Sequence, residues 1–152
     1  MLPRELPTNL AARSALDGAD LKVDFTAVPR IIFTTPNVAA VGLTDGQANA
    51  QGIRCACRIL PLSAVPRALV NRDTGGFVKI VAEQASGRII GATVVANGAG
   101  DVILAAVYAI QSGLTTDQVA STWAPYLTFA EGFRLAAQTF TRDVSKLSCC
   151  AA

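Results

Sequence analysis

Two adjacent cysteines, Cys149 and Cys150, are followed by only two further residues in this 152-residue sequence. A disulfide between neighbours is strained, because Cα atoms across a trans peptide lie closer together than a disulfide prefers. Two reduced thiolates on a tail are good ligands for a soft metal ion, and a tail that moves could carry the ion from one place to another. A chance pair at a frayed end has the same spacing, so spacing alone leaves both interpretations open.

A second pair, Cys55 and Cys57, is separated by one residue in a segment that alternates like a β-strand. On a strand from 53 to 60 both thiols project from one face, so they could chelate a metal ion. The same face carries Ile53 and Ile59, which favours the interpretation that the two cysteines are small apolar fillers.

Aromatic residues and a proline gather between Trp123 and Gly132. Thr128 can cap a helix there, and Glu131 then stands at the third helical position, which makes a capping box. Tyr126 precedes the cap, where an aromatic side chain can act as a hydrophobic staple. On its own, the segment indicates the start of a helix rather than a site.

Composition excludes several kinds of site. The chain has no histidine, which excludes Ser-His-Asp and Cys-His catalysis and all histidine-containing zinc sites. Gly98 and Gly100 open a helix after a strand, but Ile103 stands where a dinucleotide-binding turn has its third glycine, so a tight turn is favoured. A net charge of +2 with scattered Lys and Arg predicts neither nucleic-acid nor anionic-membrane binding, and no apolar run is long enough to span a membrane.

The elements that must hold these residues follow from periodicity and turn signals. We expect strands at 31–34, 38–43, 53–60, 76–83 and 88–96, short helices at 9–16 and 45–51, a loop at 61–66, and three helices at 98–111, from 115 or 116, and from 128 or 129 to 140. This segregated order predicts an α+β fold, an antiparallel β-sheet with helices packed on one face. We divide the chain into a connector or residual segment (1–28), one domain (29–141) and a tail (142–152).

The sequence also indicates a cellular location and an apolar surface that a partner could cover. Its first five residues lack the apolar stretch of a signal peptide, so we expect a cytoplasmic location, where thiols stay reduced. Apolar residues make up 51% of the sequence. This excess suggests that a partner covers some apolar surface, although burial in the chain's own core would look the same.

From about Val28 to its end, the chain resembles the C-terminal dimerisation domain of the flavin-dependent pyridine nucleotide–disulfide oxidoreductases. The segments that carry the resemblance are 33–44, 76–80, 89–92 and 98–101. Within that family the chain is most similar to the mercuric reductase branch, through 65–71 with Asp73 and Thr74, and through the tail 146–151. Most family members place His-Pro-Thr before the last helix, with a Glu that pairs with the His. Here that stretch is Tyr126-Leu127-Thr128, with Glu131 at the place of the Glu.

The resemblance implies a homodimer in which this domain covers the other subunit's active site. It implies that Cys149 and Cys150 capture Hg(II), the substrate ion, and pass it to an inner cysteine pair beside the partner's flavin, while Tyr126 helps the transfer. Disulfide reductases need a histidine to protonate a thiol leaving group, whereas reducing a metal ion needs no such acid. Without an imidazole to orient, Glu131 is better explained as a helix cap.

FAD and NADPH belong to the full-length enzyme in this resemblance, together with upstream domains and an inner cysteine pair that this sequence lacks. We therefore expect no cofactor on this chain alone, no complete redox centre, and no activity without the FAD and NADPH domains. Its partners would be a second copy or those domains, with Hg(II) as ligand. The alternatives are a non-catalytic assembly module and a stand-alone protein that binds thiols or mercury.

Overall fold

The computed structural model describes residues 7–18, 22 and 24–143. Its five strands are β1 (Arg30–Ile32), β2 (Asn37–Gly42), β3 (Cys55–Pro61), β4 (Phe77–Glu83) and β5 (Ile89–Ala96). Its α-helices are α1 (Pro7–Asp17), α2 (Asp45–Ala50), α3 (Pro66–Asn71), α4 (Ala99–Gln111), α5 (Thr116–Ser121) and α6 (Glu131–Gln138), and a 3₁₀ turn spans Leu62–Ala64.

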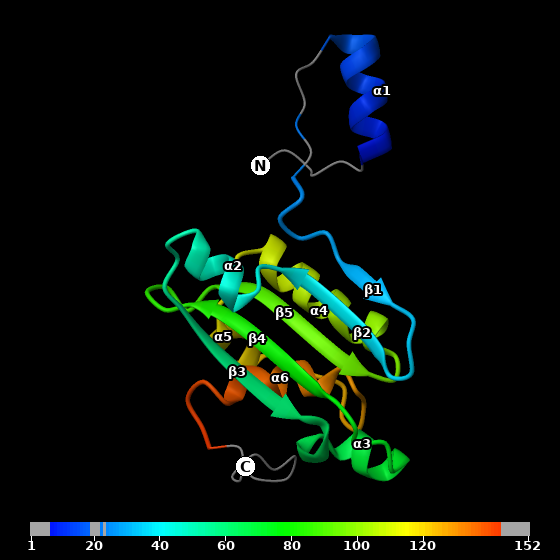
Figure 1. The fold of residues 1–152 in the computed structure, drawn as a ribbon, viewed down its shortest axis with the longest axis vertical. Coiled ribbons are helices and arrows are strands. Elements are labelled where there is room, and N and C mark those ends of the chain that lie inside the picture. The colour runs from blue at the N-terminus through cyan, green and yellow to red at the C-terminus, as the bar shows by residue number, and fades with distance from the viewer. Residues whose placement is uncertain (1–6, 19–21, 23, 144–152) are drawn as a thin grey trace.

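The strands form one antiparallel sheet in the order β1-β2-β5-β4-β3. On one face, α4 packs on β5 and β2, while α6 packs on β4 and β3. The core lies between this face and the helices, where Ile80, Val94, Ile103 and Leu135 are fully buried or nearly so. The predicted α+β fold is confirmed. Figure 1 shows α1 extending away from the sheet, beyond the start of β1.

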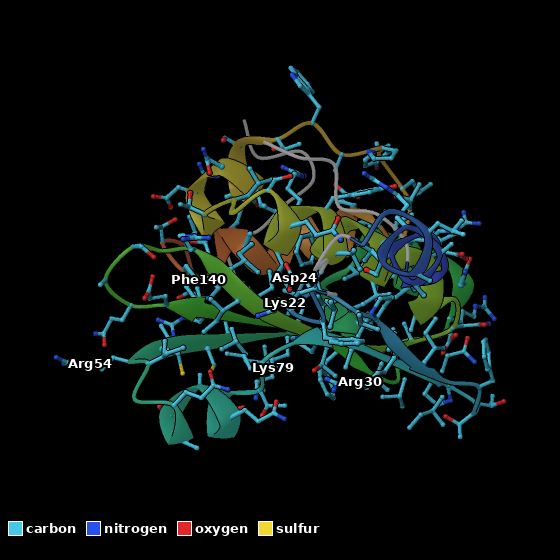
Figure 2. The ribbon with its side chains drawn as sticks, turned by 90° about the horizontal axis from the view of Figure 1, so that it is seen from above. Lys22, Asp24, Arg30, Arg54, Lys79 and Phe140 are labelled. Atoms are coloured by element: carbon cyan, nitrogen blue, oxygen red, sulfur yellow. The ribbon has the colours of Figure 1, made fainter. Side chains whose placement is uncertain are left out.

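The small helix α2 is an exception to the prediction that helices pack on one face. Figure 2 shows α2 on one side of the sheet and the longer C-terminal helices on the other. Strand β3 explains how both sides are contacted, because successive side chains point to opposite faces. Arg58 donates a hydrogen bond to the Thr139 carbonyl after α6, at 3.3 Å. The Cys55 thiol instead lies 3.8 Å from Asn49 Oδ1 in α2.

Side-chain caps fix two of the predicted helix starts. Thr44 and Gln47 form a capping box at α2, and Thr115 and Gln118 form another at α5. Each box satisfies backbone N–H groups that the first turn of a helix leaves without partners. The predicted starts of both helices are confirmed.

Several boundaries differ from the predictions, and one helix is not among them. Strand β1 ends at Ile32 because a turn follows, in which Thr34 Oγ1 donates to the Pro36 carbonyl and Asn37 Nδ2 donates to the Thr34 carbonyl, both at 2.7 Å. Strand β3 begins at Cys55, since the Ile53 N–H is bonded to the Ala48 carbonyl at the end of α2. Helix α3 is absent from the predicted elements, and the 3₁₀ turn lies within the predicted loop.

Candidate functional site

The loop between α5 and α6 presents two aromatic side chains. Trp123 is 100% exposed and Tyr126 is 62% exposed. Tyr126 is thus largely exposed at the place where the sequence allows an aromatic staple. A tryptophan that lies wholly in solvent leaves a large apolar surface that a partner could cover. The loop is a candidate contact surface, and Tyr126, the predicted transfer residue, lies on it.

Hydrogen bonds hold this loop in one conformation. Thr128 Oγ1 donates to the Pro125 carbonyl at 2.8 Å and accepts from the Glu131 N–H at 3.3 Å. Leu127 has a positive φ of 60°, a left-handed conformation that non-glycine residues seldom adopt. Its N–H donates to Glu131 Oε2 at 3.3 Å, so the strained residue is tied directly to the following helix. The backbone beside Tyr126 is thus fixed by its neighbours.

Glu131 organises the base of the loop. Its buried carboxylate accepts from Leu127 N–H through Oε2 and from Arg134 Nη2 through Oε1, the latter at 3.1 Å. The predicted capping box with Thr128 as the cap is wrong, because the N-cap of α6 is Ala130 and no side chain caps this helix. Helix α6 begins at Glu131 itself, and the carboxylate binds Leu127 N–H rather than Thr128 N–H, one residue further back than a capping box requires.

An apolar groove of about 270 Å³ lies beside the loop. Its lining includes Trp123, Ala124 and Pro125 of the loop, together with Tyr108 of α4 and Phe133 of α6. Arg134 also borders it, and its buried Nε has no hydrogen-bond partner among the described residues. A buried donor without an acceptor is costly, so an acceptor on an approaching partner would stabilise this arrangement.

The predicted metal ligands Cys149 and Cys150 lie outside the described residues. The structure shows how the chain is anchored before them. Beyond α6, the Arg58 guanidinium lies 5.4 Å from the centre of the Phe140 ring and donates to the Thr139 carbonyl. These contacts hold the turn after α6, which precedes the tail, against β3.

The other cysteine pair lies on the face of the sheet away from the main core. Cys55 and Cys57 are half-buried free thiols, and neither belongs to the core between the sheet and α4 and α6. Their neighbour on that face, Ile59, is 55% exposed. Burial, the Asp45 carboxylate and Cys55 together raise the pKa of the Cys57 thiol above its usual value. Partial exposure makes the filler interpretation a weak one for this pair.

The sequence also predicts a tight turn at Gly98. Gly98 caps α4 in a left-handed conformation, and its N–H donates to Asn37 Oδ1 at 3.3 Å, which is the tight strand-to-helix turn expected. Within the described ranges, no group of three or more Cys, Asp or Glu side chains is placed to hold a metal ion. In the same part of the chain, no helix is both long enough and apolar enough to cross a membrane.

Sequence reasoning misses two residues of this surface. The sequence pattern places Trp123 only near a helix start, and it places Tyr108 within an apolar helix, yet Tyr108 is 60% exposed. A proline two residues after the tryptophan is the only sequence signal for exposure of Trp123. For Tyr108, the apolar run around it resembles a helix buried on all sides, so periodicity gives no warning.

Comparison with known proteins shows the family to which this chain is similar. The pyridine nucleotide-disulphide oxidoreductase dimerisation domain matches residues 28–137. The chain is 59% identical over 142 residues to a mercuric reductase from Streptomyces lividans, covering 93% of the chain and 30% of that protein. It is 54% identical to a mercuric reductase from Bacillus cereus, again over 93% of the chain but 22% of that protein.

A solved structure has the same fold. LpdA from Mycobacterium tuberculosis superposes with a TM-score of 0.77 at 30% sequence identity, over 87% of this chain and 29% of LpdA. The chain thus spans less than a third of each of these three proteins. The matched residues 28–137 include the sheet, the helices that pack on it and the loop that carries Tyr126.

Proposed function

Since this chain belongs to the dimerisation-domain family of the pyridine nucleotide-disulphide oxidoreductases, we propose that it works as the dimerisation domain of a mercuric reductase. Identity of 59% and 54% to two mercuric reductases supports this branch of the family. The observation that carries the proposal is the hydrogen-bonded loop with Tyr126 exposed on it, and by the resemblance Tyr126 stands where most of the family has a histidine.

The proposed dimer surface is the groove together with the outer side of α4. Leu104 and Tyr108 are one helical turn apart on α4, so they share a face, and both are exposed. Trp123 stands next to the same groove. Large aromatic side chains that fill a partner's pocket commonly dominate the energy of an interface. A second copy of the longer protein is the partner we assign to this surface.

We propose that Cys149 and Cys150 capture Hg(II) and release it to thiols of the partner subunit. Soft thiolates bind soft cations strongly, and an incoming thiolate can bind before the previous one leaves. Each exchange forms one mercury–sulfur bond and breaks another, with a proton passing from the incoming to the leaving thiol. In this proposal Tyr126 stands at the mouth of the receiving site, where its phenol and ring contact the ion in passage.

FAD and NADPH would be held by other domains of the longer protein. The described residues do not fit either group, since the sheet is antiparallel and Gly98 closes a turn through Asn37 rather than opening a phosphate-binding βαβ unit. This domain's contribution is therefore to assemble the dimer and to deliver the ion. A cytoplasmic location is part of the same proposal, because the thiols must stay reduced to bind the metal.

The tail is tested by replacing both of its cysteines. The double variant Cys149→Ala, Cys150→Ala should lose tight Hg(II) binding at the tail, measured by competition with small thiols. The variant Cys55→Ala, Cys57→Ala is the matched control, because it removes the same number of thiols and leaves the tail intact. If replacing Cys149 and Cys150 within the Cys55→Ala, Cys57→Ala chain left the Hg(II) affinity unchanged, delivery by the tail would be contradicted and an assembly module would remain.

A stand-alone thiol or mercury buffer makes a different prediction. Cells challenged with mercury would then be protected by the chain expressed without any reductase, and the protection would need Cys149 and Cys150. In the dimerisation-domain proposal, the isolated chain should protect no better than its tail-deleted variant, because nothing reduces the captured ion.

A further inference from the structure

Strand β3 is an edge strand, and α2 covers part of the face that carries Cys55 and Cys57. The Cys55 sulfur lies 3.8 Å from Asn49 Oδ1 and 4.0 Å from the Asp45 carbonyl oxygen, both in α2. Cys57 is one strand repeat further along, about 6.6 Å away between Cα atoms for a regular strand. The two side chains point the same way. They therefore lie next to each other on the face of the strand that α2 partly covers.

We propose that Cys55 and Cys57 form a second metal site on this chain, a dithiol that binds a soft, two-coordinate cation of the Hg(II) or Cu(I) type. Its two ligands lie on β3 and do not include the tail cysteines. The proposal needs neither the tail thiols nor the dimer, so it stands or falls without them.

The small number of ligands selects the kind of ion. Zinc in proteins takes four ligands, and the described residues offer no cluster of three or more Cys, Asp or Glu here. The carboxylates that flank the pair are already engaged. Asp45 binds Lys79 Nζ at 2.5 Å, and Glu83, which lies opposite Cys55 on β4, accepts a hydrogen bond from Ser86. Only two sulfur ligands remain, which suits ions that form linear dithiolate complexes.

Partial burial leaves the site accessible from solvent. Both cysteines are half-buried, so an ion can reach them from solvent along the open edge. Burial, Asp45 and Cys55 raise the pKa of Cys57, while the nearby Lys79 ammonium acts in the opposite direction. A soft cation still binds, because it displaces the proton.

Binding is a ligand exchange without any redox step. A cation that arrives as a complex with two small thiolates forms one bond to Cys55 sulfur and one to Cys57 sulfur, and its two original bonds break. The two protons that leave the cysteines are taken up by the two released thiolates. Charge and atoms balance, and the metal keeps its oxidation state. The weak contacts of Cys55 with Asn49 and Asp45 are given up in exchange for a metal–sulfur bond.

The site is tested in the full 152-residue chain with Cys149→Ala and Cys150→Ala, so that only Cys55 and Cys57 remain. Hg(II) is titrated against a competing monothiol and followed by the ultraviolet absorption of the mercury–thiolate bond. We expect one Hg(II) per chain, with both thiols protected from alkylation. Adding Cys57→Ser should weaken binding by about a hundredfold, because the second ligand then comes from solution rather than from the same strand.

A thiol-matched control separates a built site from a mere count of thiols. The variant Cys57→Ala, Ile59→Cys keeps two thiols on the same face but four residues apart, about 13 Å on a regular strand. Ile59 is largely exposed, so the exchange should leave the fold intact, which circular dichroism can verify. The proposal predicts that this variant binds like the single-thiol chain. The proposal is overturned if this variant binds Hg(II) as tightly as the chain with the Cys55–Cys57 pair. It is also overturned if the folded chain with that pair binds Hg(II) no more tightly than the same chain unfolded in urea.

Discussion

The Asp45 carboxylate sits in the first turn of α2 and also binds Lys79 Nζ on β4, at 2.5 Å. The hydrogen bond from Lys79 is the main reason that the pKa of Asp45 lies below its usual value. A negative charge in the first turn also suits the helix dipole. One side chain thus joins the small helix to the sheet beside Cys55 and Cys57, which makes the ion pair relevant to the proposed dithiol.

Stability should depend on pH through this carboxylate. Its pKa in the folded chain is depressed, so its contribution to the free energy of unfolding is fully present above the unfolded value of 3.8 and is lost as pH falls through the folded pKa. Asp45→Asn should therefore destabilise the chain at pH 7, and progressively less as the pH falls below 3.8. Urea unfolding of both chains across this range measures the difference.

The partner of the ion pair provides the control. In a Lys79→Met chain, most of the pH-dependent effect of Asp45→Asn should disappear, because the hydrogen bond with Lys79 is the largest cause of the shift in the pKa of Asp45. If Asp45→Asn changed the free energy of unfolding by the same amount at every pH from 7 to 2, the assignment of the pH dependence to the Asp45–Lys79 pair would be contradicted.

Sequence reasoning works best where one residue bonds to its near neighbours. The caps Thr44 and Thr115 are predictable because a cap acts over three residues of sequence, whereas Thr128 bonds to the Glu131 N–H without capping α6. The common face of Cys55 and Cys57 follows from strand alternation in the same way. Exposure of Trp123 is not predictable, since it depends on how α4, α5 and α6 pack, and no local pattern encodes that packing.

Strand β5 passes unusually close to the segment that follows β2. A side chain at Gly91 would place its Cβ 1.8 Å from the Leu43 carbonyl oxygen, which is backbone and cannot rotate away. The Leu43 N–H is itself bonded to the Ile90 carbonyl at 2.9 Å. Glycine is thus required here for close approach of two backbones rather than for a turn.

Gly91→Ala should lower the free energy of unfolding by about 3 kcal/mol, because two neighbouring backbone segments must separate to admit one methyl group. Gly46→Ala is the matched control in α2, where a Cβ meets nothing within 4 Å. That exchange should raise stability by up to about 1 kcal/mol, since alanine is the better helix former. Urea unfolding measures both. Equal effects of the two substitutions would show that the close approach is not rigid.

The boundaries of most helices and strands are predictable to within a few residues, whereas the side of the sheet on which a helix packs is not. Alternating and helical periodicity predicts all five strands and the cores of α2, α4 and α5. Helix α3 gives no clear signal because it has six residues and a proline at its start, where proline both favours a helix and resembles a loop signal. The side of the sheet on which α2 lies depends on contacts with β3, which a single sequence does not reveal.

The domain as a whole has two unlike faces. One carries the groove and the exposed aromatics Tyr108 and Trp123, together with the loop that presents Tyr126. The other carries α2 and the half-buried Cys55 and Cys57. Figure 2 shows the sheet separating α2 from the helices of the groove side. Assembly and the proposed second metal site are therefore on opposite sides, so a partner on the groove would leave the dithiol accessible.

This separation leads to a prediction for assembly. We expect the chain to self-associate through the groove, with Trp123 as a central contact, since it is wholly exposed in the single chain. Trp123→Ala should weaken the dimer by about 2 kcal/mol, which is about thirtyfold in the dissociation constant measured by sedimentation equilibrium. Phe33→Ala removes another exposed aromatic, 84% in solvent beyond β1, and should leave the constant unchanged. If Phe33→Ala weakened the dimer as much as Trp123→Ala, the interface would not be the groove, because only Trp123 of these two aromatics borders it.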